Sequence, residues 1–140
     1  MDDKKKILIV DDEKDLCEIL QFNLESEGFK IDIANSGEEA LDKPLKEFDL
    51  ILLDVMMGGM TGFKVANIIR KDRNISVPII FLTAKGEEND ILTGFNVGGD
   101  DYISKPFSIK EAIARIKAIL KRGNSKEDEN NQLVYQDLVV

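Results

Sequence analysis

The stretch FDLILLDVMMGGMTG, residues 48–62, decides the fold of this chain. Its apolar run at residues 50–53 is typical of a short strand that is buried on both faces. Asp54 ends this run, and an isolated aspartate there is most simply a turn residue or a helix cap. Two other apolar runs, however, also end in polar residues, at Asp11 with Asp12 and at Thr83. We therefore treat Asp54 as a candidate functional residue.

The composition is that of a soluble globular protein of one ordinary domain. The chain has 140 residues, of which 43% are hydrophobic and 33% are charged. No apolar run approaches the length of a membrane span, and no signal peptide is visible, so we expect a cytoplasmic protein without membrane contact. A formal net charge of −8 argues against nucleic-acid binding by this chain itself.

Two residue types restrict the chemistry that is open to the chain. Cys17 is the only cysteine, which excludes an intrachain disulfide, and its place among apolar helix positions indicates a buried structural thiol. The absence of histidine excludes a Ser-His or Cys-His nucleophile pair and a histidine metal ligand. Any chemistry must therefore use carboxylates, hydroxyls and lysines.

Strands and helices are predicted to alternate along the chain. Apolar runs predict strands at residues 7–10, 29–34, 50–53, 77–82 and 102–104. Each strand is followed by a segment with helical periodicity, and the fourth of these segments covers residues 87–97. The apolar positions that show this periodicity include Leu16, Ile19, Leu20 and Leu24 in the first helix, Phe63, Ala66 and Ile69 in the third, and Ile113, Ile116, Ile119 and Leu120 in the last.

Local signals set the helix ends. The sequences SGEE and SIKE, at residues 36–39 and 108–111, form capping boxes that predict the starts of the second and last helices. Gly28 is expected to stop the first helix. Pro44 is expected to end or kink the second, because proline has no N–H to donate. The last helix is expected to end before Gly123.

Five alternations of strand and helix predict an α/β fold with a parallel sheet covered by helices on both faces. Right-handed crossovers make a doubly wound five-stranded sheet the natural solution. In the flavodoxin-like strand order 2-1-3-4-5, a crevice opens beyond the carboxyl ends of strands one and three. Asp11, Asp12 and Asp54 all fall there, and Thr83 and Lys105 follow strands four and five on the same edge.

Three neighbouring carboxylates need a positive partner, because each pair repels by several kcal/mol at a separation of about 4 Å. Oxygen ligands favour a hard cation, and two or three carboxylates plus waters fit Mg²⁺ or Mn²⁺. A carboxylate that holds Mg²⁺ can also attack a phosphoryl group. Lys105 and Thr83 are candidates to neutralise the transferred group, although each alone is most simply a surface lysine and a strand-end hydroxyl. Because Lys105 precedes a proline, it is held extended and its side chain can be aimed into the crevice.

Several motifs of the chain resemble those of one known family. ILIVDDE, LILLDVMM with GMTGF, FLTAK and GGDDYISKPF occur in the order and spacing of the receiver domains of two-component response regulators. The resemblance covers residues 5 to about 122 and implies a CheY-like fold, with residues 1–123 as the receiver domain. It also implies that Asp54 accepts a phosphoryl group from a sensor histidine kinase, which is a regulatory role and not that of an enzyme.

The resemblance assigns a role to each residue of the crevice. Asp12 is implied as a direct Mg²⁺ ligand, Asp11 as a ligand largely through water, and the backbone carbonyl of Met56 as a further ligand beside Asp54. The groups implied to contact the phosphoryl oxygens are the Thr83 hydroxyl, the Ala84 amide and the Lys105 ammonium. Tyr102 is implied as an aromatic switch residue.

The last helix and the final eight residues, LVYQDLVV, resemble regulators of the OmpR/PhoB type, whose effector is a winged-helix DNA-binding domain. This resemblance implies a linker at residues 124–132 and the start of a truncated effector at residues 133–140. DNA would be bound only through that domain. It also implies a phosphorylation-promoted homodimer through the fourth helix, the fifth strand and the last helix, with Leu92, Phe95 and Ile113 in an apolar patch and Asp101 with Arg115 as an ion pair.

The chain departs from the family pattern at two places. Gly58 stands where a proline is usual, and Pro44 interrupts the second helix.

Two further functions stay open. One is that of an Asp-nucleophile phosphatase or mutase, although many such enzymes place a second Asp two residues on, where this chain has Met56. The second is that of a receiver-like module that is never phosphorylated. For the output, a stand-alone receiver or an effector that does not bind DNA is also open.

Overall fold

The computed structural model describes residues 4–84, 96 and 98–124. The strands are β1 (Lys6–Val10), β2 (Lys30–Ala34), β3 (Leu50–Asp54), β4 (Ile79–Ala84) and β5 (Asp101–Lys105). The helices are α1 (Lys14–Ser26), α2 (Gly37–Leu41), α3 (Gly62–Asn67) and α5 (Ile109–Asn124), with a 3₁₀ turn η1 (Leu45–Glu47) and a π-helical turn η2 (Ile68–Asp72). The predicted helix at residues 87–97 lies outside the described residues except for Asn96, as do residues 125–140.

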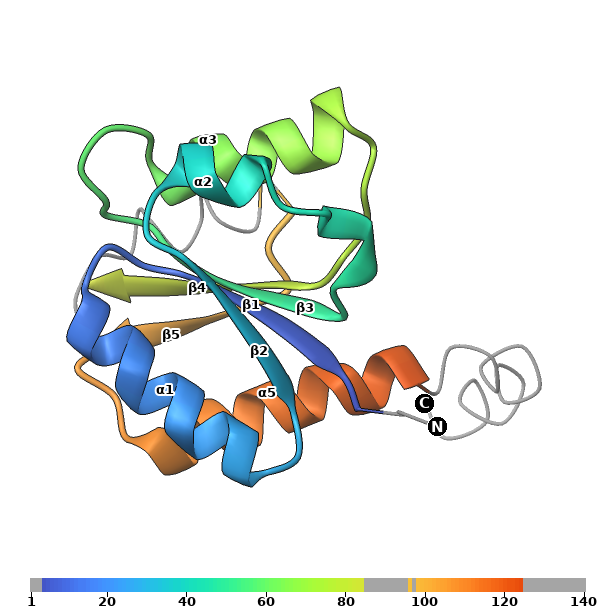
Figure 1. Ribbon diagram of the computed structural model, residues 1–140. Helices are drawn as coiled ribbons and strands as arrows, with labels where there is room; N and C mark the ends of the chain where they lie inside the picture. Colours follow the sequence, from blue (N-terminus) through green and yellow to red (C-terminus); the bar gives the residue numbers. More distant parts are fainter. Residues whose placement is uncertain (1–3, 85–95, 97, 125–140) are drawn as a thin grey trace.

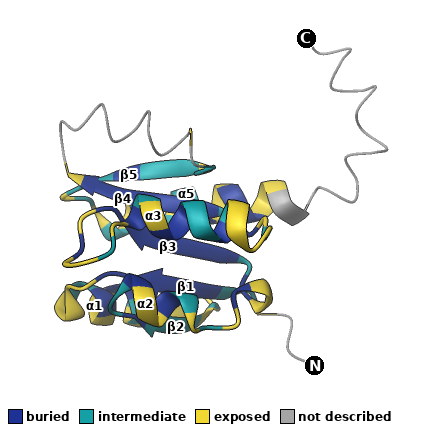
Figure 2. Cartoon of the chain, turned by 90° about the horizontal axis from the view of Figure 1, so that it is seen from above, coloured by how far each residue is buried: buried dark blue, intermediate teal, exposed yellow. Residues whose placement is uncertain are grey.

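The five strands form one parallel sheet in the order β2-β1-β3-β4-β5, which confirms the predicted doubly wound fold (Figure 1). Strand β3 lies in the centre and is buried along its whole length. In Figure 2 the strands β1, β3 and β4 are mainly coloured as buried, whereas the helices also carry exposed residues. Among the described residues, no helix is both long enough and apolar enough to cross a membrane.

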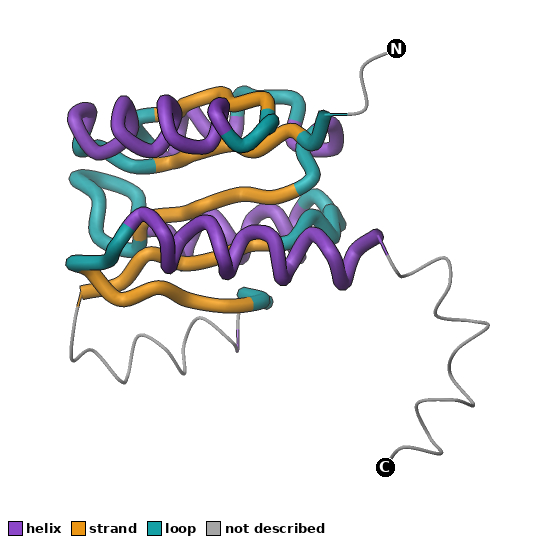
Figure 3. Tube along the Cα trace, turned by 90° about the horizontal axis from the view of Figure 1, so that it is seen from below, coloured by secondary structure: helices purple, strands orange, loops and turns teal. Residues whose placement is uncertain are grey.

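Alternate residues of the strands build two separate cores. Helices α2 and α3 cover one face of the sheet, and α1 and α5 cover the other (Figures 1 and 3). Leu8 and Val10 of β1 belong to the core under α2 and α3. Ile7 and Ile9 belong to the core under α1 and α5, together with the buried Cys17. The predicted burial of Cys17 is thus confirmed.

The predicted helix ends are mostly confirmed, with identifiable contacts. At the end of α1, Gly28 has a φ of +96° and donates its N–H to the Glu25 carbonyl at 3.0 Å, while Phe29 donates to Leu24 at 3.1 Å. This pair of bonds is a Schellman motif, which favours glycine because it needs a left-handed residue. Helix α2 ends at Leu41, shortly before Pro44, as expected.

Each predicted capping box forms the hydrogen bond from the backbone N–H to the serine hydroxyl. The N–H of Glu39 donates to Ser36 Oγ at 3.0 Å, and the Glu111 N–H donates to Ser108 Oγ at the same distance. The side chain of Glu39 does not return to Ser36 but accepts the Asn35 N–H at 2.9 Å. The serine hydroxyls therefore hold the two helix starts.

Several predicted boundaries differ from the structure, among them those of β4 and the last helix. Strand β4 begins at Ile79 and not at residue 77, because its pairing with β3 starts at Ile51 opposite Ile79, after a proline that has no N–H for the ladder. It runs on to Ala84, which pairs with Lys105 of β5. The prediction that the last helix ends before Gly123 is wrong, since α5 runs to Asn124. A glycine in a helix costs about 1 kcal/mol relative to alanine, which does not suffice to stop it.

Candidate functional site

Three aspartates meet at the carboxyl edge of the sheet. Asp11 and Asp12 follow β1, and Asp54 is the last residue of β3. One carboxylate oxygen of each residue lies within 4.8 Å of the other two. Asp11 is fully buried and Asp54 is only 3% exposed, whereas Asp12 faces solvent. The topology therefore brings together the acidic residues that the sequence predicted to meet.

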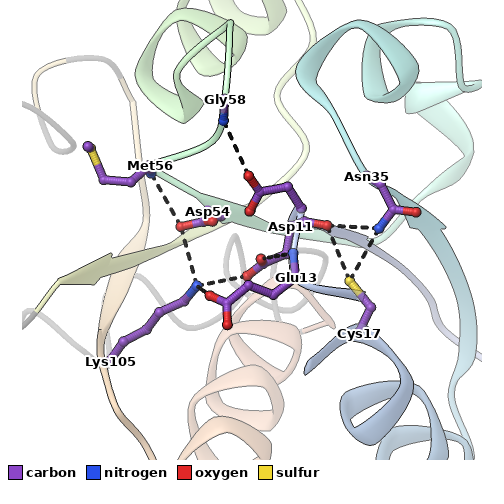
Figure 4. A network of polar contacts seen from close by, with 9 residues as sticks. Asp11, Glu13, Cys17, Asn35, Asp54, Met56, Gly58 and Lys105 are labelled. Carbon is purple, nitrogen blue, oxygen red and sulfur yellow. Dashed lines mark hydrogen bonds and ion pairs between the residues drawn. The ribbon is translucent and has the colours of Figure 1, made fainter. Parts of the chain in front are cut away.

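Lys105 at the end of β5 enters this acidic cluster (Figure 4). Its Nζ lies 3.0 Å from Asp11 Oδ2, 2.9 Å from Glu13 Oε1 and 3.5 Å from Asp54 Oδ1. Burial acts to lower the pKa of Lys105, but hydrogen bonds to Glu13 and Asp11 outweigh it and hold the pKa above its usual value. The lysine is therefore a fixed positive charge among the carboxylates.

One lysine does not neutralise the cluster. Burial and, next, the charge of Asp11 raise the pKa of Asp54 to about 7, although Lys105 and the backbone N–H of Met56 act in the opposite direction. That N–H donates to Asp54 Oδ1 at 3.3 Å. An ionised Asp54 is thus destabilised in this environment, and an added positive charge would relieve it.

Thr83 lies in β4, in register with Ser104 of the neighbouring strand. It is 1% exposed, and its Oγ1 is the only buried side-chain nitrogen or oxygen in the described part of the chain without a hydrogen-bond partner. An unpaired buried hydroxyl is costly and needs an explanation such as a ligand. Ala84, the next residue, is exposed at the end of the strand.

The loop after β3 borders the cluster. The N–H of Gly58 donates to Asp12 Oδ2 at 3.3 Å. The Met56 side chain is 67% exposed, and a hollow of about 670 Å³ opens beside Met56, Asp54 and Lys105. Phe107 also lines this hollow, so its wall combines apolar side chains with the charged residues of the cluster.

Position 62 in the GMTGF motif requires a glycine, because its backbone lies close to the backbone of Asp54, the phosphoacceptor candidate. A Cβ at this position would lie 2.2 Å from the backbone oxygen of Asp54, which is far closer than real Cβ atoms come. The Gly62 N–H also donates to the Val55 carbonyl at 3.0 Å. The glycine therefore lets the start of α3 pack directly on the end of β3.

The remaining predicted residues lie farther from the carboxylates. Tyr102 of β5 packs against the core under α2 and α3. Ile113 packs against the opposite core, and Arg115 bonds to Asp101 at 3.1 Å. Leu92 and Phe95, the other apolar candidates for a dimer surface, lie outside the described residues.

Glu13 was given no role from the sequence, although this residue contacts Lys105. Its acidic character was visible in the motif ILIVDDE, but a pair of residues 92 positions apart leaves no local pattern. Asn35 was also missed. Its Nδ2 donates to the Asp11 carbonyl at 2.9 Å, and the Cys17 thiol donates to the same oxygen at 3.4 Å, which together hold the turn after β1.

Comparisons with known proteins agree with this site. The sequence matches the family described as response regulator receiver domain over residues 7–117. A two-component response regulator from Clostridium difficile is 39% identical, with a TM-score of 0.81, and the match covers 87% of this chain and 100% of that chain.

Two structures from Thermotoga maritima are also similar. The response regulator protein TrrA, in complex with Mg(2+)-BeF, is 39% identical over 82% of this chain and 98% of that chain, with a TM-score of 0.72. DrrB, an OmpR/PhoB homologue, is 30% identical with a TM-score of 0.77, and the match covers 86% of this chain and 54% of that chain. The fold, the acidic pocket and these matches lead to one assignment: the chain belongs to the response regulator receiver domain family, the regulatory phosphoacceptor domains of two-component systems.

Proposed function

We propose that this receiver domain accepts a phosphoryl group on Asp54 from the phosphohistidine of a sensor histidine kinase, in a reaction that requires Mg²⁺. The observation that carries the proposal is the position of Asp54, a buried carboxylate 3.5 Å from the Lys105 ammonium and within 4.8 Å of two other aspartate oxygens. The chain has no histidine of its own, which agrees with a separate phosphodonor.

The residues of the cluster fit a hard divalent cation. The available donors are carboxylate oxygens, which Mg²⁺ and Mn²⁺ prefer. Burial and the charge of Asp11 raise the pKa of Asp54, so a bound cation would favour its ionised form. Asp11, Asp12 and Asp54 would hold the ion together with the backbone carbonyl of Met56. When bound, the ion neutralises charge on the carboxylates and on the transferred group.

The chain's own groups account for the transfer. A carboxylate oxygen of Asp54 forms a bond to phosphorus as the bond from phosphorus to the donor nitrogen breaks, and the electron pair of that bond stays on the imidazole, which takes a proton. The product is an acyl phosphate on Asp54. Lys105 would balance the phosphoryl charge, and the Thr83 hydroxyl and the Ala84 N–H would donate to its oxygens. The hollow beside Asp54 leaves room for the donor.

The proposed response to phosphorylation begins at Thr83. Turning the Thr83 hydroxyl to a phosphoryl oxygen would give its unpaired Oγ1 a partner and would free space that Tyr102 could occupy. We propose that this change favours an OmpR/PhoB-type homodimer through the predicted fourth helix, β5 and α5 and, in the cytoplasm, controls a C-terminal winged-helix domain that begins near residue 133. The similarity to DrrB supports this output.

Mass spectrometry after incubation with acetyl phosphate and Mg²⁺ tests the proposal. We expect one added phosphoryl group on the wild-type domain, none on Asp54→Asn, and none without Mg²⁺. Asp42→Asn, which removes one exposed carboxylate outside the site, is the matched control and should be modified like the wild type. Full modification of Asp54→Asn would contradict the assignment. No modification of the wild type would favour a receiver-like module that is not phosphorylated, and sustained release of phosphate from phosphomonoesters would favour a phosphatase.

A further inference from the structure

The side chain of Glu13 does not serve the helix that it begins. Glu13 is the N-cap residue of α1, yet its carboxylate makes no capping hydrogen bond. N-cap positions favour serine, threonine, aspartate and asparagine, whose short side chains reach the first free N–H groups of the helix. The Glu13 carboxylate instead accepts a hydrogen bond from Lys105 Nζ at 2.9 Å. Its contact with the lysine therefore takes the place of a helix cap.

Lys105 is held closer to Glu13 and Asp11 than to the phosphoacceptor. Its Nζ lies 2.9 Å and 3.0 Å from those two carboxylates but 3.5 Å from Asp54. The three oxygens that converge as candidate metal ligands come from Asp11, Asp12 and Asp54, and Glu13 does not belong to that set. Under the proposed function, a cation takes up the charge of Asp11 and a phosphoryl group modifies Asp54. Among the partners of Lys105 in the described part of the chain, Glu13 alone keeps its free charge throughout.

We propose that Glu13 is a positioning residue that holds Lys105 away from Asp54 and competes with the phosphoryl group for the lysine ammonium. This inference rests on the proposed function. The contact makes a bound phosphoryl group less stable than it would be with a free lysine. Glu13 thereby limits the affinity of the site for phosphoryl-like anions and keeps Lys105 ordered while the site is empty.

The exposure of the three groups makes this contact reversible. The Glu13 side chain is 62% exposed, whereas that of Lys105 is 21% exposed and that of Asp11 is fully buried. Release of Lys105 therefore leaves the Glu13 carboxylate in water and not stranded in the interior. The Glu13 backbone stays in place, because its N–H donates to Asp11 Oδ1 at 2.9 Å. Only the side chain has to give up its partner.

The first test is the affinity for beryllofluoride, which stands in for the phosphoryl group on Asp54, measured by calorimetry at saturating Mg²⁺. Glu13→Gln should bind beryllofluoride about fivefold more tightly than the wild type, the factor that corresponds to the upper range for an ion pair with an exposed partner. Glu18→Gln removes the same charge from the exposed side of α1 and is the matched control, with an expected affinity equal to that of the wild type. In a Lys105→Ala background, Glu13→Gln should have no effect, because the competition needs the lysine.

The second test needs neither metal nor anion. A crystal structure of metal-free Glu13→Gln should place Lys105 Nζ within hydrogen-bond distance of Asp54, closer than the 3.5 Å of the wild type. An unchanged lysine position, an unchanged beryllofluoride affinity, or an equal gain in the Lys105→Ala background would overturn the role of Glu13. If the wild-type domain itself fails to bind beryllofluoride, the proposed function fails, and the crystal structure still decides whether Glu13 holds the lysine.

Discussion

The N–H of Gly58 donates a hydrogen bond of 3.3 Å to the carboxylate of Asp12, and this contact joins the loop after β3 to the turn after β1. A proline at position 58, which is usual in similar receivers, would have no N–H to donate. The departure from the family pattern thus supplies a donor to Asp12, the most exposed member of the acidic cluster. Its carboxylate is held beside Asp11 and Asp54 by a neutral group.

Magnesium should stabilise the unphosphorylated domain, because the ion would relieve carboxylate repulsion that exists only in the folded state. At a hundredfold excess over the dissociation constant, the free energy of unfolding should rise by about 2.7 kcal/mol. Asp12→Ala should abolish this gain, and Asp15→Ala, an exposed acid in the first turn of α1, should retain it. Thermal unfolding with and without millimolar Mg²⁺ measures the effect. An unchanged melting temperature together with no detectable binding would count against the metal assignment.

The stability of the metal-free domain should fall as Asp54 ionises. Its pKa is raised from 3.8 to about 7, so the folded state binds this proton more tightly than the unfolded state. The resulting stabilisation is fully present below about pH 4 and is lost as the pH rises through about 7. The free energy of unfolding of Asp54→Asn should therefore match that of the wild type near pH 4 and exceed it at pH 8. The excess should be on the order of 1.4 kcal/mol for each unit by which folding raises the pKa of Asp54. Urea unfolding in a chelator measures this, with Asp42→Asn as the control; parallel curves for Asp54→Asn and the wild type would refute it.

Two glycines near the site should respond oppositely to alanine. Gly62→Ala forces a Cβ against the Asp54 backbone and should destabilise the domain by about 1–3 kcal/mol, with loss of beryllofluoride binding. Gly58→Ala meets no atom within 4 Å and has no positive φ, so it should be neutral or slightly stabilising. Chemical denaturation of the two variants gives the comparison. Equal stability would show that the end of β3 can yield to the added methyl group.

Met56 should influence the lifetime of the phosphorylated state. Its exposed apolar side chain beside Asp54 cannot orient an attacking water by a good hydrogen bond, so we expect slow hydrolysis. Met56→Asn should hydrolyse the acyl phosphate faster than the wild type, and Met56→Leu, which stays apolar, should not. Phosphate release after removal of the phosphodonor measures the rate. An equal or slower rate in Met56→Asn would show that another residue is limiting.

Dimerisation of the activated domain should depend weakly on salt. Glu111 already bonds to Arg115 at 3.2 Å and Lys117 to Glu27 at 2.6 Å within one chain, so these charges have intrachain partners. Exposed ion pairs contribute roughly 0–1 kcal/mol each, so the apolar patch should dominate. Sedimentation with beryllofluoride and Mg²⁺ should show a dimer at low and high salt that Phe95→Asp disrupts. A persistent monomer, or a dimer insensitive to Phe95→Asp, would place any interface elsewhere.

The sequence predicted the fold well because its signals are local and repeated. Each apolar run ends at a polar residue, and parallel strands bring all such ends to one edge. The strand ends alone were therefore enough to place Asp11, Asp54, Thr83 and Lys105 correctly, without any knowledge of their contacts.

The features that could not be predicted from the sequence depend on partners far along the chain. The limits of β4 follow from its pairing with β3 and β5, and propensity alone did not place them. Glu13 looked like the last of three acids before a helix, and only the three-dimensional contact with Lys105 distinguishes it from a surface residue. The Gly58 contact with Asp12 likewise joins two loops 46 positions apart.

Among the described residues, the two cores on opposite faces of the sheet share no buried residue. By strand alternation, Asp54 shares the face of Leu50 and Leu52, towards α1 and α5. Thr83 shares the face of Phe81, towards α2 and α3, where Tyr102 also packs. Under the proposed function, a change at Asp54 on one side of the sheet would reach Tyr102 on the other side through Thr83, whose buried hydroxyl has no hydrogen-bond partner in the described part of the chain.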